Sequence, residues 1–79
     1  MQLRVKAFGV TKDILGNREI VIELQGQTVA QLRAKLVSEY PALSGLKSLM
    51  IAVNNNYAED NLPLQNTDEV ALIPPVSGG

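Results

Sequence analysis

The chain is 79 residues long, the length of one small domain. Its charges nearly cancel, with 7 Lys and Arg against 8 Asp and Glu, so it lacks the positive excess needed to bind nucleic acid or an anionic membrane. It has no Cys and no His, which excludes disulfides, thiolate nucleophiles, imidazole bases and the usual zinc ligands. We therefore expect one domain with no nucleic-acid partner, no membrane partner and no metal of its own.

Hydrophobic residues make up 46% of the chain, which is enough for a globular core. The longest apolar runs, residues 49–53 and 70–76, fall far short of the roughly 20 residues that span a bilayer. The first nine residues also lack the apolar stretch of a signal peptide. These features predict a cytoplasmic protein.

The chain opens with two segments that have the alternation of a half-buried strand. Apolar and polar side chains alternate in residues 2–8, which leaves Phe8 on the polar face. A turn at Gly16-Asn17 precedes a second alternating segment, residues 19–24. The pattern predicts two strands joined by a long connection that contains only a short apolar piece.

One helix is predicted in the middle of the chain. Thr28 followed by Gln31 matches a capping box, so the helix should begin at Val29. Apolar residues then recur at spacings of three and four, which places one stripe against a core. Pro41 ends the helix, because the residue before a proline is disfavoured in helical conformation. The stripe consists of Val29, Leu32, Leu36, Val37 and Tyr40.

The second half of the chain has the pattern of two further strands. Residues 49–54 alternate, and the three asparagines of residues 54–56 predict a turn, since Asn tolerates left-handed backbone. Residues 58–67 are polar, with two leucines that we expect to pin the segment as a loop. Residues 70–73 form the last predicted strand, in which alternate side chains point to opposite faces.

The predicted order is strand, strand, helix, strand, strand, which indicates an α+β domain over residues 1–73 with one helix across a mixed sheet. The first and last strands could pair in parallel at its centre, as in the β-grasp. Ferredoxin-like halves have a compatible order, so periodicity alone leaves both folds open.

The sequence ends in Pro74-Pro75-Val76-Ser77-Gly78-Gly79, called the tail below. Its two prolines fix φ and donate no hydrogen bond, so they stop the last strand and hold the chain extended. Six extended residues reach about 20 Å, far enough to enter another protein's active site. Gly78 and Gly79 lack a Cβ and could pass through a narrow channel. The alternative is an ordinary disordered end.

The terminal carboxylate becomes reactive only after activation. A resonance-stabilised anion has no good leaving group, whereas adenylation by ATP creates a mixed anhydride that a sulfur or nitrogen nucleophile can attack. We therefore expect Gly79 to be the reactive residue.

The ending from Asp68 to Gly79, with its Asp-Glu-Val and Pro-Pro-Val-Ser-Gly-Gly motifs, resembles that of the MoaD-type sulfur carriers, the ubiquitin-like small subunits of molybdopterin synthase. Residues 3–8, the helix start at Thr28-Val29 and the segment 52–54 also fall where that family has them. The resemblance covers nearly the whole chain, and its most specific part is the ending.

The resemblance implies a β-grasp fold and a function. An E1-like enzyme would use ATP to adenylate Gly79 and convert it to a thiocarboxylate, with sulfur taken from a separate donor. The tail, with Gly78 in the channel, would then enter the large synthase subunit and give that sulfur to a pterin precursor. Two copies of each subunit would form a heterotetramer. The chain would bind no cofactor and would catalyse nothing alone.

A docking surface is expected where apolar side chains lie outside the predicted core. Phe8 and Ile73 lie out of phase with the buried residues of their strands, and Tyr57 follows the asparagine turn. The alternative is scattered surface hydrophobes, which are normal. The tail residues expected to contact the partner are Pro74, Pro75, Val76 and Ser77.

Other functions are compatible with the same features. The chain could serve another sulfur pathway, such as thiamine thiazole formation or a thiolation route, or it could be a modifier joined to lysines through its terminus. A non-catalytic β-grasp interaction domain is the structural alternative. Deletion of Gly79 separates that last case, because only the carriers and the modifier would lose function.

Overall fold

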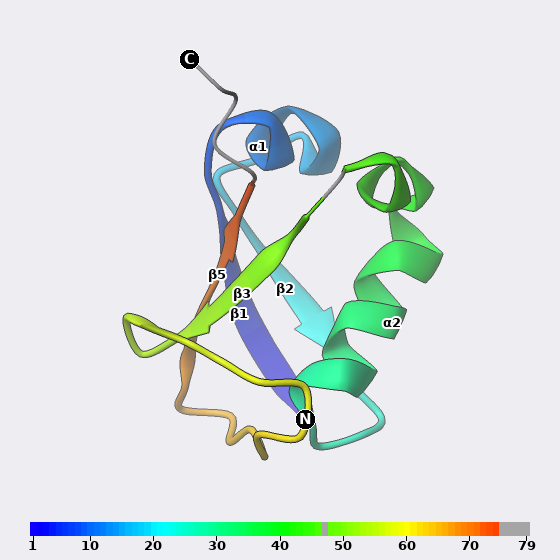
Figure 1. Ribbon diagram of the computed structural model, residues 1–79. Coiled ribbons are helices and arrows are strands. Elements are labelled where there is room, and N and C mark those ends of the chain that lie inside the picture. The colour runs from blue at the N-terminus through cyan, green and yellow to red at the C-terminus, as the bar shows by residue number, and fades with distance from the viewer. Residues whose placement is uncertain (47, 75–79) are drawn as a thin grey trace.

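The computed structural model describes residues 1–46 and 48–74, in which a five-stranded sheet packs against one main helix (Figure 1). The elements in chain order are β1 (Gln2–Ala7), α1 (Val10–Leu15), β2 (Glu19–Glu23), α2 (Val29–Glu39), the 3-10 helix η1 (Pro41–Gly45), β3 (Met50–Val53), β4 (Asn56–Tyr57) and β5 (Glu69–Ile73). Helix α2 lies across one face of the sheet, whereas α1 sits at one end of it, beside the end of β5 (Figure 1).

The strand order is β2-β1-β5-β3-β4, and it defines a β-grasp. Strands β1 and β5 pair in parallel at the centre, with Val5 opposite Val70, while β1–β2, β3–β5 and β3–β4 pair antiparallel. The predicted α+β class and the parallel pairing of the first and last strands are therefore confirmed. This strand order, with its parallel central pair, differs from that of the ferredoxin-like alternative.

The core lies between the sheet and α2 and follows the predicted alternation. In β5, Val70 and Leu72 are buried, whereas Ala71 and Ile73 face the other way and are half-buried. The helix contributes Leu32 and other apolar side chains, each worth about 1.5–3 kcal/mol when fully buried. The largest fully buried side chains are Leu3, Leu32, Leu36, Leu43, Ile51, Leu72, Val5, Val29, Val70 and Thr11.

The predicted capping box forms at the start of α2. The Thr28 hydroxyl accepts a hydrogen bond from the Gln31 backbone N–H at 3.3 Å, and the Gln31 Oε1 accepts from the Thr28 backbone N–H at 3.0 Å. The same Oε1 accepts from the Gln27 N–H at 2.7 Å. The helix ends at Glu39, and Pro41 begins η1, as a proline at the first position of a helical turn can.

Three short elements, α1, η1 and β4, were missed by the sequence patterns. The apolar piece between the first two strands is the six-residue helix α1, which is too short to show a helical period. The last residue of the asparagine turn and Tyr57 form the two-residue strand β4, which is too short to show alternation. Asn54 and Asn55 do take positive φ angles, 53° and 70°, as predicted.

The predicted boundaries also need small corrections. Strand β1 ends at Ala7 rather than Phe8, because Phe8 begins the turn into α1, and β5 begins one residue earlier, at Glu69. Of the two leucines expected to pin the polar loop, Leu64 is buried while Leu62 is exposed. Only one of them therefore anchors the loop in the core. Within the described residues, no helix has the length and apolar character needed to cross a membrane.

Candidate functional site: the open face of the sheet and the tail

The sheet face opposite α2 carries a shallow hollow of about 360 Å³. The three side chains that the sequence singled out for docking, Phe8, Tyr57 and Ile73, all line it, although they come from distant parts of the chain. Phe8 is 50% exposed and Tyr57 68% exposed, so both offer apolar surface to a partner. The full lining, called the hollow below, consists of Lys6, Phe8, Ala52, Asn55, Tyr57, Glu69, Ala71 and Ile73.

Phe8 is held at the rim of the hollow by the turn between β1 and α1. Its backbone N–H donates to the Thr11 hydroxyl at 2.9 Å, and that hydroxyl donates in turn to the Phe8 carbonyl. The Thr11 side chain is completely buried, so water does not compete for these bonds. Phe8 thus stays exposed on an anchored backbone.

Sheet pairing brings the other two aromatic and apolar side chains to the same place. Tyr57 of β4 pairs with Ala52 of β3, and Ile73 of β5 pairs with Met50 of β3. Because β5 also pairs with β1, residues of four neighbouring strands line the hollow. This parallel pairing explains how residues 8 and 73 become neighbours.

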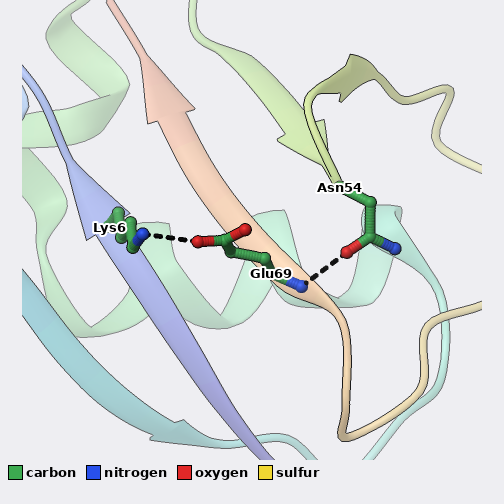
Figure 2. Close-up of polar contacts among 3 residues, drawn as sticks. All are labelled: Lys6, Asn54 and Glu69. Atoms are coloured by element: carbon green, nitrogen blue, oxygen red, sulfur yellow. Dashed lines mark hydrogen bonds and ion pairs between the residues drawn. The ribbon is translucent and has the colours of Figure 1, made fainter.

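Two of the residues that line the hollow, Lys6 and Glu69, form an ion pair (Figure 2). The Lys6 ammonium on β1 donates a hydrogen bond to the Glu69 carboxylate on β5, and both side chains are about half exposed. The hydrogen bond and the charge of the partner raise the pKa of Lys6 and lower the pKa of Glu69. The two opposite charges neutralise each other within the hollow.

Asn54 connects this ion pair to the turn before β5. Its side-chain oxygen accepts from the Glu69 backbone N–H at 2.9 Å (Figure 2), and its amide donates to the Asp68 carboxylate at 3.0 Å. The other oxygen of Asp68 accepts from the Gln65 backbone N–H at 2.8 Å. The Asp-Glu pair of the ending therefore holds the start of β5 in place, a role that the sequence did not reveal.

The structure describes only the root of the tail. Pro74 follows β5 and is half-buried, with its Cγ close to Gly9. Pro75, Val76, Ser77, Gly78 and Gly79 lie outside the described residues, so their expected roles stay predictions, as does the division of the chain at residue 73. The docking roles of Phe8, Tyr57, Ile73 and Pro74 are predictions too, although the structure places the first three together.

Lys6, Asn54 and Thr11 were not recognised as part of this site from the sequence, and the pairing of Lys6 with Glu69 was not predicted. Polar residues on the outer face of a strand have the pattern of an ordinary solvated face, and the ion pair joins residues 63 positions apart. Among residues 1–46 and 48–74, no group of three or more His, Cys, Asp or Glu could hold a metal ion.

The fold and the open face define a ubiquitin-like β-grasp domain whose last strand leads into a Gly-Gly tail. The model of the ThiS family matches residues 5–79, and the chain belongs to this family. Together with the relatives described next, this match confirms the resemblance inferred from the ending.

Similar proteins agree with this assignment. The molybdopterin synthase sulfur carrier subunit of Caenorhabditis briggsae is 37% identical over 83 positions, covering 100% of this chain and 99% of that one. The crystal structure of SAMP1 from Haloferax volcanii has a TM-score of 0.83 and 27% identity, with all of both chains covered. A complex of subunits 1 and 2 of molybdopterin-converting factor from Helicobacter pylori 26695 contains a chain with a TM-score of 0.71 and 30% identity, again over all of both chains.

Proposed function

We propose that this chain is the sulfur carrier subunit of a molybdopterin synthase and that Gly79 carries the sulfur. The observation that supports this most is that β5, the central strand of a β-grasp domain, ends at Ile73 beside the hollow, and that the sequence reaches Gly78-Gly79 a few residues later. A chain that belongs to the ThiS family and resembles sulfur carrier subunits over its full length is expected to use that ending in the same way.

The chemistry begins with activation of the Gly79 carboxylate. A carboxylate oxygen attacks the α-phosphorus of ATP in an E1-like enzyme, and pyrophosphate leaves. A donor at the oxidation level of sulfide then attacks the acyl carbon, the bond to AMP breaks, and one proton is released. AMP carries away one of the former carboxylate oxygens, and Gly79 ends in a thiocarboxylate, which can attack a pterin precursor.

The hollow is the surface with which the chain would dock on the large synthase subunit. Phe8, Tyr57 and Ile73 supply its apolar contacts, and the Lys6–Glu69 pair brings no net charge into the interface. The tail would follow β5, whose last residue Ile73 lines the hollow, and would enter the active site of the partner. The complex of two related subunits from Helicobacter pylori supports such a pairing, and we propose a heterotetramer with two copies of each subunit.

The chain would act as a non-catalytic carrier in the cytoplasm. ATP is consumed by the activating enzyme, and this chain would bind no cofactor of its own. The large subunit would supply the groups that bind and orient the pterin, since this chain has neither His nor Cys to serve as an acid, base or nucleophile.

The test is the intact mass of the chain after incubation with ATP, an E1-like enzyme and a sulfur donor, next to a chain that lacks Gly79. We expect a gain equal to the replacement of one oxygen by one sulfur in the full chain and no gain in the shortened one. An unchanged mass under conditions that thiolate an established carrier would show that the domain is an interaction module.

A protein modifier is the second candidate, and its support is the likeness to the small archaeal modifier protein SAMP1. In that case the activated Gly79 would be attacked by a lysine amine rather than by sulfur, and an isopeptide bond would form as AMP leaves. Peptide mass mapping of target proteins would then find a C-terminal fragment of this chain on lysine side chains. A carrier for another sulfur pathway would pass the mass test but would not thiolate the pterin.

A further inference from the structure

Gly9 has two features, and its role in turning the chain explains only the first of them. Its backbone has φ 56° and ψ −132°, a conformation that side chains of L-amino acids rarely adopt. In addition, a Cβ at this position would lie 3.2 Å from the Cγ of Pro74. The first feature serves the turn from β1 into α1, whereas the second connects that turn to the root of the tail.

The contact is specific to Gly9. Gly16, at the other end of α1, also has a positive φ, 81°, but a Cβ there would meet nothing within 4 Å. The two glycines flank the same short helix and share the positive φ, yet only Gly9 lies against Pro74. Their ψ angles differ, −132° at Gly9 and 2° at Gly16, so backbone conformation is separated from packing against Pro74 by the Pro74→Ala background described below.

The backbone on both sides of Gly9 is fixed. The Thr11 hydroxyl is hydrogen-bonded to both the backbone N–H and the carbonyl of Phe8. The Gly9 carbonyl accepts a hydrogen bond from the Lys12 N–H at 3.1 Å. On the other side of the contact, Pro74 directly follows Ile73, which is paired in the sheet. Two anchored segments thus meet at the space left by the missing Cβ, and a methyl group there would have to move the Pro74 ring.

We propose that Gly9 is a positioning residue for sulfur transfer: its missing side chain seats the Pro74 ring and so sets the direction in which the tail leaves the sheet. The five residues after Pro74 reach about 17 Å when extended, so a rotation of roughly 10° at the root would displace their end by about 3 Å. This inference rests on the proposed function, because the direction of the tail matters only if the tail enters a partner.

A first experiment tests the contact without any partner. In the full chain, a nuclear Overhauser effect is expected between the Gly9 Hα and Pro74 Hγ protons. A nitroxide on Ser77→Cys gives a unique label, since the chain has no Cys, and its broadening of backbone amides maps where the tail lies. Gly9→Ala should change this broadening profile, and the matched control Gly16→Ala should leave it unchanged.

A second experiment measures the consequence for chemistry. With an E1-like enzyme that adenylates the full chain, Gly9→Ala should lower kcat by at least about fivefold with KM unchanged, because the folded domain still binds while the tail is misdirected. Gly16→Ala should change neither constant. In a Pro74→Ala background, which lacks the ring, the substitution at Gly9 should have no additional effect.

The outcomes separate the two proposals. Gly9→Ala behaving like Gly16→Ala, or an equal loss with and without the Pro74 ring, would overturn the positioning role. If no E1-like enzyme activates the full chain, the proposed function fails, while the proton contact and the broadening profile still decide whether Gly9 seats the tail. Should Gly9→Ala not fold, Pro74→Ala tests the same contact, with a changed profile expected and an unchanged one contradicting the proposal.

Discussion

Glu69 makes three hydrogen bonds on the open face of the sheet, to Lys6 and twice to Asn54. Its carboxylate accepts from Lys6, its backbone N–H donates to the Asn54 side chain, and its backbone carbonyl accepts from the Asn54 N–H at 2.8 Å. The residue thereby joins β1, β5 and the end of β3 at the surface. None of these partners could be inferred from sequence spacing, because each contact depends on strand order.

Replacing Lys6 by Met should raise the pKa of the Glu69 carboxyl toward its ordinary value, because the hydrogen bond and the positive charge that stabilise the carboxylate are lost. Carbon-detected NMR titration of the Glu69 carboxyl would measure this. Lys6→Arg, which keeps the charge, is the control and should leave the pKa low. An unchanged pKa in the Met variant would show that the pair does not form in solution.

The same pair defines a pH window for its contribution to stability. Because the folded-state pKa of Glu69 is lowered, the contribution is present above the unfolded pKa, about 4.3, and is lost as the pH falls through the folded value. Because the pKa of Lys6 is raised, the contribution is present below about 10.4 and is lost as the pH rises through the folded value. Both groups are exposed, so salt should weaken the effect.

At the scale of elements, α2 shows what sequence patterns predict well. A stripe at spacings of three and four identified the buried face, and the motif of Thr28 and Gln31 identified the first residue. Both signals are local, so they do not depend on knowing the rest of the fold. The strands with clear alternation, β1, β2, β3 and β5, were found for the same reason.

Substituting Thr28 by Ala should lower the free energy of unfolding by about 1 kcal/mol, because the Gln31 backbone N–H loses its acceptor. Urea unfolding followed by circular dichroism would measure the change. Thr28→Ser keeps the hydroxyl and should stay close to the unsubstituted chain. Equal stability of the Ala variant would indicate that the capping box contributes nothing in solution.

Elements with no period of their own were not predictable. Helix α1 has six residues and begins after Gly9, whose positive φ has no signature beyond the glycine itself, and β4 has two residues. Both are specified by tertiary contacts: α1 by the buried Thr11 and Leu15, and β4 by pairing with β3. Phe8 and Ile73 were found because they broke the pattern of their strands and Tyr57 because it follows the asparagine turn, whereas Gly9 required the contact with Pro74.

At the scale of the whole molecule, the two faces of the sheet have different tasks. The face under α2 is closed and apolar and holds the fold together, while the opposite face leaves Phe8 and Tyr57 exposed near the root of the tail. Side chains on the open face can therefore be changed with little effect on the core. This separation allows docking to be tested independently of folding.

Phe8→Ser should weaken binding to the large synthase subunit by roughly tenfold while changing the unfolding free energy little, because Phe8 is half exposed and its apolar contacts are expected from the partner. Isothermal titration calorimetry would give the Kd. Val21→Ser is the matched control, since Val21 is 61% exposed but does not line the hollow. Equal weakening by both substitutions would argue against the hollow as the docking surface.

The central claim is that Gly79 delivers sulfur to a pterin. The most direct measurement uses the chain loaded with ³⁵S at its terminus and mixed with the large synthase subunit and the pterin precursor. We predict that the label moves to the pterin and that the chain returns to the mass of the free carboxylate. Label that stays on the chain, or that is released while the chain becomes attached to lysines, would contradict the account.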